Sequence, residues 1–137
     1  MTYDEAFEIL VQDGTIYNPP YDAIFDLVNA ILERKVNLAF DLLQQAYEVG
    51  ESTMVILSVL YNNVKAVLQV QSYVGSDLSQ ATGLTNWQIK NASVHTGRYS
   101  NNELIYLLFL IQKIERGIKS GLIEDGIAVP YLLIQTI

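Results

Sequence analysis

The sequence contains no cysteine and only one histidine among its 137 residues. Without cysteine the chain forms no disulfide and no thiol-based site, and the composition fits a reducing compartment. The single histidine, His95, has no pair of carboxylates nearby in the sequence, so ligands for a zinc or two-metal site are missing. We therefore expect no metal and no catalytic residue, and we interpret His95 as a surface residue of a helix.

Phosphate-binding motifs are also missing. Neither Gly-x-x-x-x-Gly-Lys-Ser/Thr nor Gly-x-Gly-x-x-Gly occurs in the chain, which excludes the usual ATPase and dehydrogenase sites. Glu124 and Asp125 are adjacent acids on an expected loop, where a helix-capping role is the preferred interpretation. With no cofactor and no catalytic set expected, the sequence indicates a binding or assembly module rather than an enzyme.

Hydrophobic runs are short in this chain. The longest strongly apolar run, LIYLLFLI at 104–111, is far below the roughly 20 residues that a membrane-spanning helix needs. The first residues, MTYDEAFEIL, are acidic and lack the basic start and apolar core of a signal peptide. We therefore expect a soluble, cytoplasmic protein with no membrane partner.

Positive charge is scarce, with 8 Lys and Arg against 15 Asp and Glu and a formal net charge of -7. The acids are concentrated in residues 1–51, which hold ten acids and two bases, whereas residues 52–137 hold five acids and six bases. Autonomous DNA-binding proteins usually carry a basic face, because counterion release from phosphates supplies most of their affinity. We expect DNA contact to be weak or indirect.

Hydrophobic residues make up 50% of the chain and recur at helical steps of three and four. Capping boxes at 2–5, 85–88 and 100–103 mark three helix starts, and Pro20 suits a first helical position. Expected helix ends are marked by Gly14, Gly50, Gly75 and Gly121. The sequence predicts an all-α fold, a single helical bundle of about seven or eight helices that includes a helix-turn-helix-like hairpin.

Two long helices should form the core of this bundle. The stretch after Ser52 is rich in valine and isoleucine, but its spacing favours a helix over a strand. Its expected inner face holds Val55, Leu57, Leu60, Val64, Val67, Leu68 and Gln71. The second long helix is expected from about 100 to 120, apolar nearly all round in its first turns, with Leu107, Leu108 and Ile111 at the centre of the domain. A short apolar helix near Pro130 should close the chain.

The segment SQATGLTNWQIKNA, residues 79–92, is typical of a helix-turn-helix: a short helix, a turn at Gly83, and a second helix from 86 to about 98. One interpretation is a hairpin within a larger domain, with its apolar side chains facing the core: Leu78, Leu84, Trp87 and Ile89. The alternative is a stand-alone DNA-binding or protein-interaction module in which base edges are contacted by Gln88, Lys90, Asn91 and His95. The acidity of the chain favours the first interpretation.

The order of these features resembles a known family. The segments IFDLVNAILERKVNLAFDLLQQAYEVGESTMVILSVLYNNVKAVLQVQ, LSQATGLTNWQIKNA and LLFLIQKIERGIKSGL follow one another as in the C-terminal collar domain of the bacterial DNA polymerase III clamp-loader delta subunit. The resemblance covers about residues 23–137. It rests most on Phe25, Leu27, Val28, Ala30 and Ile31, on Gly83 with Leu84, and on Ile118, Lys119, Ser120 and Gly121.

This resemblance implies a non-catalytic assembly domain that joins the other clamp-loader subunits in a collar. Residues 1–19 would be the end of a preceding lid domain and its linker, with Met1 the start of a fragment, and residues 20–137 would be the collar domain. Contact with the sliding clamp would then belong to N-terminal domains that this chain lacks.

Lys113, Arg116 and Lys119 follow at steps of three near the end of the second long helix, so they should form one strip. One interpretation is an ordinary solvated face whose cations complement the negative end of the helix dipole. The other, which the resemblance suggests, is a surface that faces the collar or the DNA.

Overall fold

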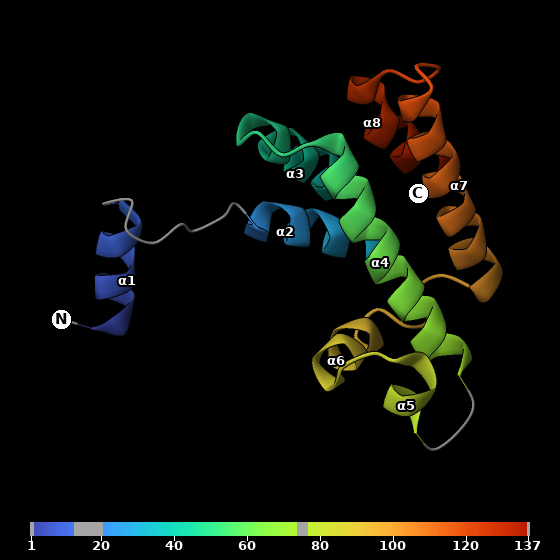
Figure 1. Cartoon of the computed structure of the whole chain (residues 1–137), viewed down its shortest axis with the longest axis horizontal. Helices are drawn as coiled ribbons and strands as arrows, with labels where there is room; N and C mark the ends of the chain where they lie inside the picture. Colours follow the sequence, from blue (N-terminus) through green and yellow to red (C-terminus); the bar gives the residue numbers. More distant parts are fainter. Residues whose placement is uncertain (1, 13–20, 74–76, 137) are drawn as a thin grey trace.

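Eight helices account for most of the residues that the computed structural model describes, which are 2–12, 21–73 and 77–136. They are α1 (Tyr3–Gln12), α2 (Tyr21–Leu32), α3 (Val36–Glu48), α4 (Thr53–Ser72), α5 (Leu78–Thr82), α6 (Asn86–Ser93), α7 (Asn101–Lys119) and α8 (Asp125–Thr136) (Figure 1). No residue in the described part of the chain lies in a strand. The expected all-α bundle is therefore confirmed.

Helix α4 is the centre of the bundle and packs against α2, α6, α7 and α8. The α2–α3 hairpin covers one side of it and the α7–α8 hairpin another, and α3 also contacts α8 (Figure 1). The largest fully buried side chains come from α2, α4, α7 and α8: Leu27, Ile31, Leu32, Ile56, Leu57, Leu60, Leu104, Leu107, Ile111, Ile114, Leu132 and Leu133. One apolar core therefore joins these four helices.

By length and composition alone, α4 could also cross a membrane. Within the bundle, however, four other helices pack against it, as they do around the core helix of a globular domain. Its apolar character is explained by this packing.

Side-chain caps begin several helices where the sequence predicts them. Thr85 and Ser100 each form a complete capping box, with Gln88 and Glu103 respectively, and the Ser52 hydroxyl accepts from the Val55 amide at 3.1 Å. At α1 the Thr2 hydroxyl accepts from the amide of Glu5 at 3.2 Å, which is one half of the expected box. The expected features at Gly14, Pro20 and Gly75 lie outside the described residues.

The end of α2 is tied to the start of α7 by a cluster that sequence reasoning missed. Arg34 reverses the chain with a positive φ of 60°, an uncommon conformation for a non-glycine residue. Its guanidinium lies 4.1 Å from the ring centre of Tyr99 and forms an ion pair with Glu103. Tyr99 is buried and donates its hydroxyl to the Ile31 carbonyl at 2.6 Å. The cluster therefore connects residues nearly 70 positions apart in the sequence.

This cluster also shifts two pKa values. Burial raises the pKa of Tyr99, and the positive charge of Arg34 acts in the opposite direction. The pKa of Glu103 is lowered, first by the backbone N–H of Ser100 and then by Arg34. Glu103 thus remains a carboxylate that both caps α7 and pairs with the cation.

Two polar side chains of α4 also join distant elements. Thr53 is fully buried. Its hydroxyl lies 2.8 Å from the Tyr47 hydroxyl and donates to the main-chain carbonyl of Asp125 at 3.3 Å. Gln71 donates to the Tyr99 carbonyl at 2.9 Å and accepts from the Gly97 amide at 2.8 Å. The inward position expected for Gln71 is thus used for hydrogen bonding rather than apolar packing.

Several expected boundaries and burial states are wrong. Helix α6 ends at Ser93 instead of about 98, because the chain must turn at Gly97, with φ 86°, to bring Tyr99 into the core. Helix α8 is longer than expected and contains Pro130, since its buried residues on both sides of the proline hold it in the core: Ala128, Val129, Leu132 and Leu133. Val55 is exposed and Leu108 only half-buried, because each lies outside the contact face of its helix.

Candidate interaction surfaces

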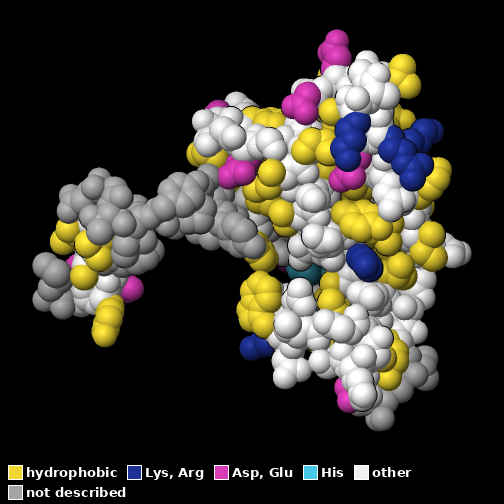
Figure 2. Space-filling view, viewed as in Figure 1, with side chains coloured by type: hydrophobic (Ala, Val, Ile, Leu, Met, Phe, Trp, Pro, Cys, Tyr) yellow, Lys and Arg dark blue, Asp and Glu magenta, His cyan; other side chains and the backbone are white. Residues whose placement is uncertain are grey.

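The three expected site cations lie on the C-terminal half of α7. Lys113, Arg116 and Lys119 lie outside the buried core, and none of them forms an ion pair with another described residue. Figure 2 shows Lys and Arg side chains gathered over this end of α7. Arg116 and Lys119 belong to the last turn, where cations complement the helix dipole.

The strip is broader than its spacing first indicates. One residue turns about 100° around an α-helix, so each step of three returns about 60° short of a full turn. Lys113 and Lys119 therefore flank Arg116 on either side. The buried residues of α7 are Leu104, Leu107, Leu110, Ile111, Ile114 and Gly117. They lie on the opposite side of the helix, so Arg116 is near the middle of its outer face.

The N-terminal half of the same outer face is apolar. Ile105 and Phe109 lie on the side of Arg116 and are 54% and 60% exposed. Tyr106, about 100° around the helix from Ile105, is 50% exposed and lines a hollow with Gln135 and Thr136 of α8. As the sequence predicts, α7 is apolar nearly all round in its first turns, but the expectation that this whole surface lies in the core is wrong. Ile105 and Phe109 thus face outward on the same side of α7 as Arg116. Figure 2 shows hydrophobic side chains beside Lys and Arg side chains on this part of the surface.

The helix-turn-helix segment forms a hairpin of α5 and α6 that packs on α4. Gly83 ends α5 with a left-handed φ of 75°, as the turn requires, and Asp77 caps its start. Leu78, Leu84 and Ile89 are half-buried, in line with the hairpin interpretation. Trp87 departs from it, because 61% of its surface is exposed and it therefore lies outside the core.

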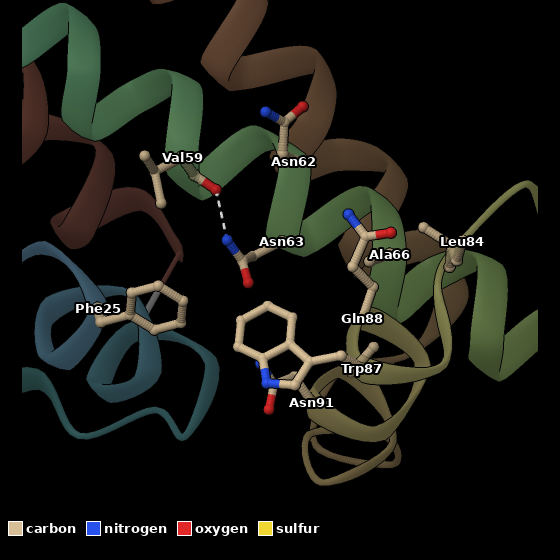
Figure 3. Close-up of a pocket in the computed structure, with 10 residues that line it drawn as sticks. Phe25, Val59, Asn62, Asn63, Ala66, Leu84, Trp87, Gln88 and Asn91 are labelled. Atoms are coloured by element: carbon tan, nitrogen blue, oxygen red, sulfur yellow. Dashed lines mark hydrogen bonds between the residues drawn. The ribbon is translucent and has the colours of Figure 1, made fainter. Parts of the chain in front are cut away.

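Trp87 instead forms one wall of a small open cavity of about 200 Å³ between α2, α4 and α6 (Figure 3). Its indole meets the ring of Phe25 edge-on, with ring centres 6.2 Å apart and planes at 70°. Asn63, Asn91 and the other polar lining residues are uncharged, and Asn63 donates to the Val59 carbonyl at 2.8 Å. The cavity therefore offers hydrogen-bonding groups but no charged or metal-binding group.

The residues of the DNA-reading alternative do not form one exposed surface. Gln88 and Asn91 line the same cavity on one side of α6, whereas Lys90, two residues from Gln88, points to another side of the helix. The Gln88 side chain also already accepts from the Thr85 amide within the capping box. His95 is only 8% exposed, so its expected surface role is wrong. This arrangement does not support base contacts by all four side chains.

His95 is buried because it joins the end of α6 to α2. Its Nε2 lies 3.1 Å from Oδ1 of Asn29, a partner 66 positions away that no local pattern could reveal. Nδ1 has no hydrogen-bond partner among the described residues. Burial lowers the pKa of His95 below its ordinary value, with Arg98 adding to the effect and Glu33 opposing it.

In the described part of the chain, no group of three or more His, Cys, Asp or Glu side chains is placed so that it could hold a metal ion. Glu124 and Asp125 lie at the start of α8, with Asp125 in its first turn. There Asp125 contributes its main-chain carbonyl to Thr53, and no side-chain cap by either acid is found among the described residues.

Comparison with known proteins places this helical arrangement in context. Residues 21–136 match the family model for the DNA polymerase III delta subunit, C-terminal domain. Curated protein sequences give no significant match.

Among solved structures, the Bacillus subtilis DNA clamp loader delta protein, YqeN, has a similar fold, with a TM-score of 0.72 and 19% sequence identity. The match covers 83% of this chain and 35% of that protein, so this chain spans about a third of its length. At this identity the likeness concerns the fold.

Proposed function

The chain belongs to the family formed by the C-terminal domain of the DNA polymerase III delta subunit, and from this premise we propose that it is a non-catalytic assembly domain of a bacterial clamp loader. Its task is to join the collar that holds the subunits of the loader together while the sliding clamp is placed on DNA. The family match over residues 21–136 carries this proposal. The fold shared with the Bacillus subtilis delta protein supports it.

We assign residues 20–137 to the collar domain and residues 1–19 to the end of a preceding lid domain and its linker. Two observations support this division: the family match begins at residue 21, and Figure 1 shows α1 apart from the bundle of α2 to α8. We propose that contact with the sliding clamp belongs to other domains of the delta subunit. The loader works in the cytoplasm, and this domain meets DNA only weakly or indirectly.

The direct test is co-elution. The chain, mixed with the other clamp-loader subunits of its organism, should shift to the size of a complex in gel filtration. Because ring contacts are heterologous, the mixture of different subunits should give a larger complex than the chain alone. Failure of the chain to co-elute with any loader subunit would count against the assembly role.

The basic strip of Lys113, Arg116 and Lys119 is proposed to face either the collar or the DNA. Its three cations form no ion pair among the described residues, which suits either partner. On an acidic domain they should bind single-stranded DNA only weakly, and the effect should appear mainly in the assembled loader, where other subunits add charge.

Reversal of all three cations to glutamate in the full-length subunit separates these roles. Loss of primed-template affinity with a reduced salt dependence, while assembly is retained, would assign the strip to DNA. Lost assembly would assign it to a collar interface. If assembly, DNA affinity and salt dependence all stay the same, the strip is ordinary solvated surface.

A further inference from the structure

The outer face of α7 combines two features that a solvated helix does not need. Its first half exposes Ile105 and Phe109, and its second half carries Lys113 and Arg116. Positions 105, 109, 112 and 116 follow at steps of four and three, so they form one row along the helix. On this row Ile105 and Phe109 are apolar and Arg116 is basic. Between them lies Gln112, which donates to the Tyr61 hydroxyl of α4 at 3.0 Å. An apolar segment and a basic segment therefore lie on the same row, separated by Gln112.

We propose that this face of α7 binds an amphipathic helix of a neighbouring subunit, one that carries apolar side chains along its contact face and carboxylates in its first turn. The proposal rests on the assembly role proposed above and goes further by naming the surface and the chemistry of its partner. Large exposed apolar side chains are typical of interaction sites when they lie together. A partner that is acidic at one end complements the adjacent cations.

Charge complementarity also gives the direction of the partner helix. Lys113 and Arg116 lie toward the C-terminal end of α7, so the carboxylates of the partner must lie there too. Acidic side chains are favoured in the first turn of a helix, because they complement its positive dipole end. The partner helix therefore runs antiparallel to α7, with its N-terminus beside Arg116 and its apolar part over Phe109.

The length of the face sets the size of the contact. From Ile105 to Arg116 the row rises about 16 Å, which corresponds to about three helical turns. Phe109 lies near its middle and is 60% exposed, the position at which an aromatic side chain contributes most to binding. Among the described residues, no carboxylate forms an ion pair with Lys113 or Arg116. The one ion pair that involves α7 there joins Glu103 to Arg34.

Cysteine footprinting tests the surface directly, since the chain has no cysteine of its own. Phe109→Cys and Arg116→Cys are alkylated with a maleimide in the chain alone and in the complex with the other loader subunits. We expect complex formation to slow alkylation at both positions on the order of tenfold or more, as burial at an interface centre excludes solvent. Trp87→Cys is the matched control, because Trp87 is as exposed as Phe109 but lies on α6, and its alkylation should not change.

Two further variants separate the apolar and the charged contributions. Phe109→Ser should weaken assembly about tenfold or more with an unchanged salt dependence, whereas Arg116→Gln should reduce the salt dependence itself. Trp87→Ser should leave assembly unaffected.

The outcomes distinguish this inference from the assembly role. If the chain joins the complex but positions 109 and 116 remain as reactive as before, the α7 surface is wrong and the assembly role stands. If protection appears in the chain alone and grows with its concentration, the occupant is a second copy and the proposal is overturned. If the unaltered chain does not join the complex, the assembly role itself fails.

Discussion

The imidazole of His95 lies where its charge affects local stability. It is buried between α6 and α2, and its Nε2 faces Asn29. Burial lowers its pKa, so in the folded protein the neutral form is favoured over a wider pH range than in the unfolded chain. Glu33 and Arg98 act on it in opposite directions, which leaves burial as the main cause.

The sign of the pH dependence follows from this shift. The unfolded state binds the proton more readily, so the free energy of unfolding decreases as the pH falls below the ordinary histidine pKa of about 6.5. We expect the urea concentration at the unfolding midpoint of the wild-type chain to decrease as the pH is lowered from about 7.5 to about 5.5. His95→Gln should flatten this dependence, since the chain has no other histidine. An equal dependence in both proteins would show that His95 does not titrate in this way.

Neighbouring leucines of α7 provide a second test at the residue scale. Leu107 is 1% exposed and in the core, whereas Leu108 is only partly buried against it. Leu107→Ala should lower the free energy of unfolding by roughly 2–5 kcal/mol through lost burial and a residual cavity. Leu108→Ala should cost clearly less. Denaturant midpoints measure both, and a reversed order would contradict the orientation of α7.

At the scale of elements, the connection between α7 and α8 depends on a close approach at Gly117. A Cβ atom at Gly117 would lie 2.4 Å from Cδ1 and 2.7 Å from Cγ1 of Ile123, which folds back over the end of α7. The Leu122 and Ile123 amides both donate to the Gly117 carbonyl, at 2.8 and 3.0 Å. The glycine therefore allows the turn to pack tightly before α8 begins.

Gly117→Ala should destabilise the fold. The gain in helix propensity is about 1 kcal/mol, but the overpacking against Ile123 should cost about 1–3 kcal/mol and outweigh it. Gly126→Ala is the control, because Gly126 is also helical and has no atom within 4 Å of the added Cβ. Thermal denaturation should show a lower Tm for Gly117→Ala than for Gly126→Ala; a higher one would mean that Ile123 moves aside freely.

At the scale of the whole molecule, the chain should act through contacts rather than nucleotide chemistry. Its sequence has no phosphate-binding loop, and its net charge is -7. We expect ATP to leave its Tm unchanged. A ligand at about a hundred times its Kd would stabilise the fold by about 2.7 kcal/mol, so a clear ATP-dependent increase in Tm would show that a nucleotide site exists.

Local chemistry determined most of the secondary structure. The capping boxes at Thr85 and Ser100 and the glycine turns at Gly50, Gly83 and Gly121 act within a few residues, so the sequence alone was enough to predict them. The helical spacing in α4 and α7 likewise predicted the all-α class and part of the core: Leu57, Leu60, Val64, Val67, Leu107 and Ile111. The order of these segments also pointed to the family.

Only the tertiary structure decided which apolar and polar residues lie inside. Trp87 and Phe109 are as apolar as their buried neighbours, but 61% and 60% of their surfaces stay exposed. His95, Tyr99 and Arg34 are fixed by partners more than 60 positions away. The physical reason is that helical periodicity defines a face of one helix, whereas burial depends on which other helix packs on that face. The spacing of the cations on α7 predicted the basic strip, but the exposure of the apolar residues beside it was visible only once α4 and α8 had been placed against the opposite side of the helix.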